Sequence, residues 1–186
     1  FTINGLFYDP CEDELLDHVG GQADIRRRLV RSIGNPRDRL SEDYLRMLRA
    51  VRFASRLGFD IHEDTFAAIR EKAPEITRIS SERVRDELTL ILTAENPGRG
   101  LSLLQQTGLL HEVLPEVAAM DGVAQPPEYH PEGDVLTHVR LMLDLASEAD
   151  LTLAWGILLH DVGKPPTFAL SDRIRFNGHD AVGAQM

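Results

Sequence analysis

Apolar residues recur every three or four positions through the middle of this chain, which is the period of an α-helix. From residue 34 to about residue 120 every periodic segment has this spacing. The expected helices cover 41–58, 64–73, 81–94, 96–108 and 109–119. Ser41 is a natural N-cap for the first of them and Gly58 a natural stop, while Asn96-Pro97 opens the fourth. The pattern predicts an all-helical middle section.

The two ends of the chain have different patterns. Residues up to about 33 supply two strand signals and one helix, which follows Gly20-Gly21 and carries the basic run 26–31. Residues 121–134 are rich in Pro and Gly without periodicity, which indicates either a linker or the rim of a site. Beyond them, an apolar helix over 151–159 and a short strand over 173–176 are expected. We therefore predict a mainly α chain of three parts, 1–33, 34–120 and 121–186.

Composition narrows the class of protein. With 186 residues, 42% of them hydrophobic, the chain can bury one or two modest cores, and its longest apolar run is too short to cross a bilayer. The single Cys11 excludes an intrachain disulfide, and no secretory leader is visible, so a cytoplasmic protein is expected. A chain that begins at Phe1 instead of Met is expected to be a fragment. The net charge of −10 argues against indiscriminate nucleic-acid binding, so any RNA contact has to come from local basic patches.

One such patch is a stripe of arginines on the expected helix 41–58. At about 100° per residue, Arg46, Arg49 and Arg52 fall within one sector of the helix, with Arg56 inside it and apolar residues opposite. The helix should bury one face and present guanidinium groups from the other. Acids outnumber bases by 30 to 20, so the stripe could instead pair with carboxylates elsewhere in the chain.

The order of residues on this helix resembles a known motif. The segment Glu42-Asp43-x-x-Arg46-x-x-Arg49-Ala50-Val51-Arg52-Phe53-Ala54 is similar to the nucleotide-selecting helix of the tRNA nucleotidyltransferase and poly(A) polymerase family, which includes CCA-adding enzymes. The resemblance implies that Asp43 and Arg46 hydrogen-bond the base edge of the incoming nucleotide. It assigns Arg49 and Arg52 to the ribose and triphosphate, for which planar guanidinium forks are suited.

Three further segments extend the resemblance. Residues 1–9 are strand-like and resemble the segment after the family's Arg-Arg-Asp motif, residues 17–25 its flexible loop, and residues 79–88 its last helical motif. Asn4 is either a nucleotide contact or the mark of a strand bulge. In the last motif Ser80 or Ser81 should cap the helix, and we interpret Arg83 and Glu87 as structural residues that brace the arginine helix.

The resemblance implies transfer of CMP or AMP from CTP or ATP to the 3′ end of tRNA. It places two magnesium ions on a Gly-Ser and Asp-x-Asp motif that this sequence lacks, so none of its residues is expected to be catalytic and the chain alone should be inactive in transfer. By this resemblance, the fold is the end of an α/β nucleotidyltransferase head over 1–33, a helical neck over 34–120, and the first half of an all-helical HD domain over 121–186. The motifs are compatible with CCA, A-only, CC-only or poly(A) addition.

The HD assignment depends on a donor set near the end of the chain. His160 and Asp161 end the apolar helix, with His138 one helix upstream and His179 downstream, and no thiolate is nearby. Imidazole and carboxylate groups suit a divalent transition metal. The residues resemble the HD phosphohydrolase superfamily, whose closing aspartate is expected beyond Met186. His130 lies in a Pro-rich loop and is interpreted as an exposed turn residue outside the site.

Other interpretations of this donor set stay open. His160 could instead cap its helix through the helix dipole, with Asp161 solvating the next turn. His179 could be a ligand of a second metal, a phosphate contact or a loop residue. The function competing with transfer is therefore a metal-dependent hydrolase of phosphoesters or cyclic nucleotides. A non-enzymatic alternative is an RNA-docking module or one that forms a homodimer.

Overall fold

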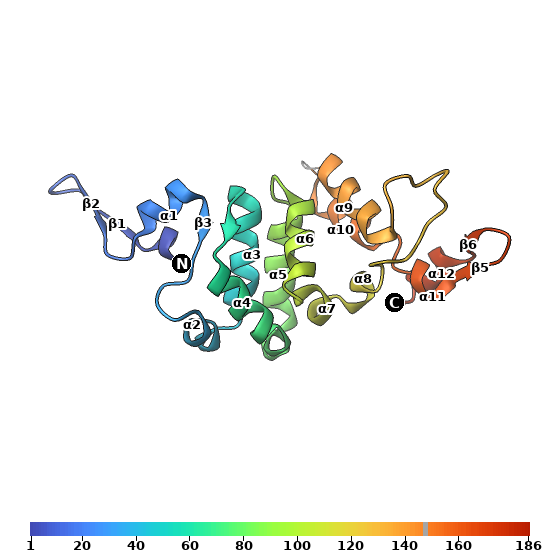
Figure 1. The fold of residues 1–186 in the computed structure, drawn as a ribbon, viewed down its shortest axis with the longest axis horizontal. Helices are drawn as coiled ribbons and strands as arrows, with labels where there is room; N and C mark the ends of the chain where they lie inside the picture. The colour runs from blue at the N-terminus through green and yellow to red at the C-terminus, as the bar shows by residue number, and fades with distance from the viewer. Residues whose placement is uncertain (147–148) are drawn as a thin grey trace.

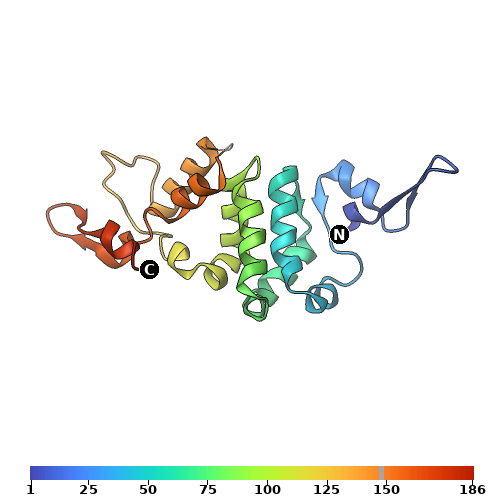
Figure 2. The same cartoon turned by 180° about the vertical axis from the view of Figure 1, so that it is seen from behind.

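The computed structural model describes residues 1–146 and 149–186 as an elongated array of short helices (Figure 1). Elements follow one another along the long axis roughly in chain order, from a hairpin near the N-terminus to a second hairpin near the C-terminus. The view from behind shows the same order (Figure 2). No helix in the described ranges is long and apolar enough to cross a membrane.

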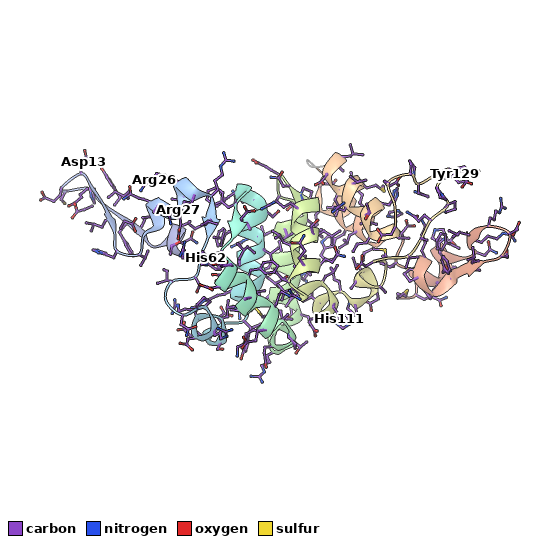
Figure 3. All side chains as sticks on the ribbon, viewed as in Figure 1. Asp13, Arg26, Arg27, His62, His111 and Tyr129 are labelled. Atoms are coloured by element: carbon purple, nitrogen blue, oxygen red, sulfur yellow. The ribbon has the colours of Figure 1, made fainter. Side chains whose placement is uncertain are left out.

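The N-terminal part contains a 3-10 helix, a hairpin and one α-helix. They are η1 (Thr2–Asn4), β1 (Leu6–Asp9) paired antiparallel with β2 (Glu14–Asp17), and α1 (Gly21–Arg27). The expected strand over 1–9 is therefore wrong for its first residues, and Asn4 marks no bulge because it lies in η1. The basic run leaves α1 early because Arg28 adopts a left-handed conformation. Arg26 and Arg27 are exposed at the end of α1 (Figure 3).

The arginine helix is shorter than expected. Two helices, α2 (Pro36–Glu42) and α3 (Leu45–Leu57), replace the single helix predicted over 41–58. Ser41 is not an N-cap, because α2 begins earlier, where Asn35 accepts from the Arg37 backbone and proline occupies the first helical position. Asp43 has an extended backbone that separates the two helices. Gly58 ends α3 in a left-handed conformation, as predicted.

The helices after α3 follow the expected order. They are α4 (Glu63–Lys72), α5 (Ser81–Leu92), α6 (Pro97–Gln106), α7 (Leu109–Val113) and α8 (Pro115–Ala118), with η2 (Ala73–Arg78) between α4 and α5. The single helix expected over 109–119 is wrong because Pro115 cannot continue α7 and instead opens α8. The strand pair β3 (Leu29–Val30) and β4 (Asp60–Ile61) is parallel. This pair joins the predicted head to the predicted neck.

The C-terminal part is helical with one hairpin. It contains α9 (Val135–Leu145), α10 (Leu151–Leu159), α11 (Lys164–Thr167) and α12 (His179–Gly183). Between α11 and α12, β5 (Phe168–Leu170) pairs antiparallel with β6 (Ile174–Phe176). The short strand over 173–176 was expected, but its partner was not, so the part predicted as all-helical contains a hairpin.

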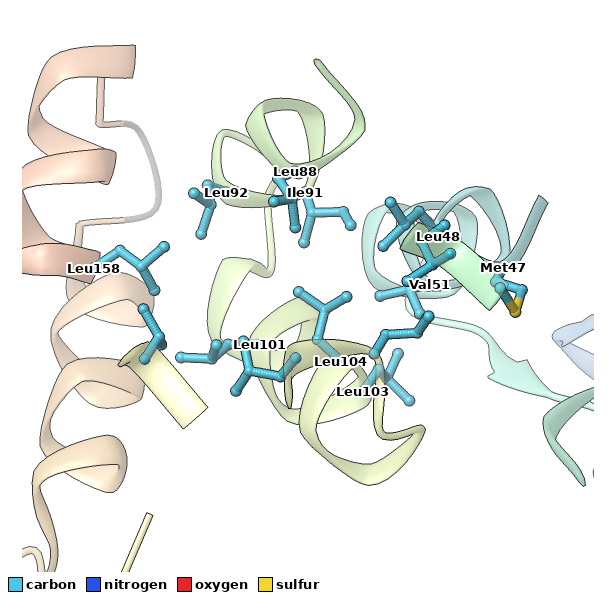
Figure 4. Close-up of a cluster of buried hydrophobic side chains, with 14 of the residues drawn as sticks. Met47, Leu48, Val51, Leu88, Ile91, Leu92, Leu101, Leu103, Leu104 and Leu158 are labelled. Carbon is cyan, nitrogen blue, oxygen red and sulfur yellow. The ribbon is translucent and has the colours of Figure 1, made fainter. Parts of the chain in front are cut away.

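A continuous apolar core runs through the middle of the molecule. Leu48 and Val51 of α3 pack with Ile91 of α5 and Leu104 of α6, and none of these side chains is more than 1% exposed (Figure 4). The core extends to Leu158 of α10. This packing fixes the buried face of α3 and leaves its arginine face for the surface.

Candidate functional site

Three arginines of α3 line one cavity. Arg46, Arg49 and Arg52 surround a hollow of about 160 Å³ together with Asn4 of η1. Phe1 and Phe53 complete its wall, with their rings edge to face at a centroid distance of 5.9 Å. The structure thus brings four of the five predicted nucleotide-binding residues to one place, from two segments distant in sequence.

A buried carboxylate holds two of these arginines. Glu87 of α5 is 5% exposed, and its two oxygens lie 3.1 Å from Arg49 Nε and 3.3 Å from Arg52 Nε. The Arg52 guanidinium also lies over the Phe53 ring, 4.8 Å from its centroid. Because each guanidinium has five N–H donors, one carboxylate contact leaves further donors for a ligand.

The remaining arginine is held by the helix before it. Arg46 Nη1 donates to Glu42 Oε2 at 2.6 Å. Hydrogen bonds from Arg46 and Arg39 lower the pKa of Glu42. Three arginines of the stripe therefore pair with carboxylates, as the alternative interpretation allowed, and the same three line a cavity.

Asp43 does not line this cavity. Its Oδ1 accepts from the Leu45 backbone at 3.1 Å, and its Oδ2 accepts from Arg83 Nη2 at 3.2 Å. Arg83 thus holds Asp43 just before α3, and Glu87 holds the middle of the arginine face, so both brace this region as the sequence interpretation had it. To reach a nucleotide in the cavity, Asp43 would have to exchange its contact with Arg83.

A second cluster gathers around Asp161, which is 2% exposed. One ligand atom each from His138, His160 and Asp161 lie within 4.8 Å of one another. His160 Nε2 is 3.1 Å from Asp161 Oδ2, and His179 Nε2 is 3.7 Å from Asp161 Oδ1. The four residues predicted for the metal site therefore meet, from α9, the end of α10 and the start of α12.

The orientation of the three rings follows a common rule. His160 Nδ1 lies 2.8 Å from the Ile157 carbonyl, and His179 Nδ1 lies 2.9 Å from the Phe176 carbonyl. His138 Nδ1 lies 2.6 Å from Glu132 Oε1. Carbonyl and carboxylate oxygens only accept, so each Nδ1 is the donor in its contact, while the Nε2 atoms of His160 and His179 face Asp161.

Glu132 and His130 are site residues that the sequence interpretation missed. His130 is half-buried, with Nδ1 3.1 Å from Glu132 Oε1 and its ring 4.7 Å from that of His138. The exposed-turn interpretation of His130 is therefore wrong: the loop folds over His138. Hydrogen bonds from the Glu132 backbone amide and from the His130 and His138 side chains lower the pKa of the Glu132 carboxyl to about 2. The available signal was the pattern His130-x-Glu132, whose Glu lies six residues before His138.

The cluster fits a divalent cation. Burial would raise the pKa of Asp161, but hydrogen bonds from His160 and Lys164 outweigh it and lower that pKa to about 2. The bond to Asp161 also raises the pKa of His160. Lys164 Nζ, 2.7 Å from both Asp161 Oδ2 and Gln125 Oε1, balances the buried charge. A buried carboxylate beside several imidazole nitrogens is a donor set for a transition metal.

The chain is similar to known RNA-extending proteins. Residues 1–31 match the family model of the poly A polymerase head domain, and residues 58–121 match that of the probable RNA and SrmB-binding site of polymerase A. An A-adding tRNA nucleotidyltransferase of Deinococcus radiodurans is 38% identical over 198 residues, covering 100% of this chain. The multifunctional CCA protein of Halorhodospira halophila is 39% identical over 191 residues, covering 98% of it.

The fold is also similar to that of a solved CCA-adding enzyme. The CCA-adding enzyme of Bacillus stearothermophilus in complex with CTP has a TM-score of 0.60 and 31% identity, with 89% of this chain and 39% of that chain covered. This chain spans 44% of the length of each of the two curated relatives. The chain therefore belongs to the tRNA nucleotidyltransferase and poly(A) polymerase family.

Proposed function

We propose that the protein containing this chain transfers CMP or AMP from CTP or ATP to the 3′ end of tRNA, and that this chain selects the nucleotide. The observation that carries the proposal is the cavity in which Arg46, Arg49 and Arg52 meet Asn4. Two relatives, an A-adding tRNA nucleotidyltransferase and a multifunctional CCA protein, support the substrate class.

Each residue has a distinct part in this proposal. Arg46 presents donors to the base edge, with Asp43 as its acceptor partner once Asp43 leaves Arg83. Arg49 and Arg52, held by Glu87, contact ribose and phosphates. Asn4 closes the opposite side of the cavity. Magnesium would supply charge neutralisation for the leaving pyrophosphate from an Asp-x-Asp motif that this sequence does not contain.

The test uses the full-length protein and a tRNA transcript lacking its 3′ terminal nucleotides. Each labelled nucleoside triphosphate is supplied alone and in pairs, and extension is read on a sequencing gel. The proposal expects incorporation of C, A or both, with GTP and UTP excluded. Incorporation of all four nucleotides at similar rates, or of none, would contradict it.

We propose a second activity for the cluster around Asp161, hydrolysis of phosphoesters or cyclic nucleotides with a bound transition metal. Three imidazoles favour it, because each Nδ1 contacts an acceptor oxygen and the Nε2 atoms of His160 and His179 face the Asp161 carboxylate. His138, His160, Asp161 and His179 would hold the metal, and Lys164 would keep Asp161 ionised. A metal at this position would lower the pKa of a bound water molecule and orient the phosphoester.

The second proposal is tested by metal analysis of the dialysed full-length protein and of its His160→Ala/Asp161→Ala variant. A transition metal in the wild type should disappear from the variant, together with any hydrolysis of 2′,3′-cyclic nucleotides, while nucleotide addition survives. If the wild type carries no metal and the variant loses only thermal stability, the cluster is a packing feature.

A further inference from the structure

A second cavity lies beside the nucleotide cavity, where α3 and α5 end. It has a volume of about 300 Å³ and is lined by Arg52, Arg56, Leu90, Thr93, Ala94 and Glu95. Arg52 lines both cavities. Arg56 follows it by one helical turn, so the two guanidinium groups project from the same face of α3. We call this cavity the α3–α5 groove.

Arg56 differs from the other arginines of the stripe. Arg46, Arg49 and Arg52 each contact a carboxylate. Arg56 is exposed, and within the described part of the chain it forms no ion pair. Arg56 lies in the last turn of α3, where the helix dipole favours a cation. The groove therefore offers an unneutralised cation next to a candidate nucleotide site.

The other wall of the groove suits a nucleic-acid strand. Leu90 is 47% exposed and gives an apolar surface beside Arg56. A single strand alternates phosphate charges with apolar faces of ribose and base, which such a wall can contact together. Residues 90–95 also lie inside the segment that matches the RNA-binding family model. Glu95 is the one acid of the lining, and its charge opposes a phosphate.

We propose that the α3–α5 groove binds a backbone phosphate of the RNA strand that is being extended, with Arg56 as donor and Leu90 against the sugar or base. This proposal rests on the transferase function proposed above. The groove adjoins the nucleotide cavity through Arg52, so a strand seated there would approach the bound nucleotide. The triphosphate is the competing source of phosphate, and the experiment separates the two.

The test compares Arg56→Ala with wild type in the full-length protein. The Kd for a tRNA transcript should rise several-fold, and the slope of log Kd against log salt concentration should fall by about 0.7 to 0.9, the value for one lost phosphate contact. The KM for CTP and ATP should not change. Arg70→Ala is the matched control, since Arg70 is an exposed arginine on α4 away from both cavities.

Glu95→Gln gives a second test of opposite sign, because removing a repelling charge should lower the Kd for tRNA. An unchanged Kd and salt slope in Arg56→Ala would overturn the proposal, and so would an increase in the KM for CTP that matches the change in tRNA binding. Equal losses of thermal stability in Arg56→Ala and Glu95→Gln, with no change in the Kd for tRNA, would indicate that Arg56 and Glu95 form an ion pair and bind no RNA. If wild type incorporates nucleotides but Arg56→Ala binds tRNA normally, only the groove assignment fails.

Discussion

The Asp144 carboxylate of α9 accepts a hydrogen bond from the Gly98 backbone N–H at 2.9 Å, so one helix caps the N-terminus of another, α6. Asn96, the cap expected from the sequence, makes no cap bond and contacts α3 instead: its carbonyl accepts from Ser55 Oγ at 2.8 Å. The first turn of α6 thus joins the arginine helix to the part of the chain that carries the histidine cluster.

Asp144→Ala should lower the free energy of unfolding by about 1 kcal/mol, the usual value of an N-cap. Asp144→Asn keeps an acceptor oxygen and should lose less. Urea denaturation followed by circular dichroism measures both. Equal stability of the two variants and wild type would show that the capping bond contributes nothing.

Glu87→Gln should raise the KM for all four nucleotides alike, by about tenfold, because Arg49 loses a charge-assisted hydrogen bond and Arg52 loses an ion pair. The reason is that Arg49 and Arg52 share this buried carboxylate. Steady-state kinetics of the full-length protein measure the change. Glu71→Gln removes an exposed acid paired with Arg37 and is the control. A Glu87→Gln protein with normal KM but reduced thermal stability would limit Glu87 to packing.

Glu132→Gln should weaken transition-metal binding by about 10- to 100-fold, because Glu132 fixes the tautomer of His138. Titration of the dialysed full-length protein with zinc measures the affinity. Glu128→Gln removes an exposed acid of the same loop and should leave the affinity unchanged. Equal affinities in the two variants would remove Glu132 from the site.

Asp134 should stabilise the fold at neutral pH and lose this effect in acid. Partial burial raises the pKa of Asp134, but hydrogen bonds from Thr137 and Gly122 outweigh it and lower that pKa from its ordinary value. A lowered folded-state pKa gives stability that is present above the unfolded value and is lost as pH falls through the folded value. The stability difference between wild type and Asp134→Ala should therefore shrink below about pH 4. A difference independent of pH from 3 to 7 would contradict this.

The sequence predicted the order of helices well because apolar spacing and caps are local. Gly58 ended α3 as expected, and Arg46, Arg49 and Arg52 shared one face. The break between α2 and α3 was missed because it results from the extended backbone of Asp43. The spacing of apolar residues carries no information about that conformation. Likewise, the cap of α6 comes from Asp144, 46 residues away in sequence.

The candidate sites were also predicted only in part, because some of their residues are brought together by contacts distant in sequence. His138, His160, Asp161 and His179 were chosen by motif, and they meet. Glu132 and His130 were missed because their role depends on a loop that folds back onto α9, which spacing alone does not show. Asn4 reaches the arginines only through tertiary packing of η1 on the neck.

We propose that Arg46 reads the base of the incoming nucleotide while Arg49 holds its ribose and phosphates. The most direct measurement is kcat/KM of the full-length protein for each of the four nucleoside triphosphates in wild type, Arg46→Ala and Arg49→Ala, with thermal unfolding alongside. Arg46→Ala should reduce discrimination against GTP and UTP by at least about tenfold with little change in Tm, because it removes base-edge donors. Arg49→Ala should raise KM for all four nucleotides equally. If Arg46→Ala keeps full selectivity and lowers Tm instead, Arg46 serves its ion pair with Glu42 and does not read the base.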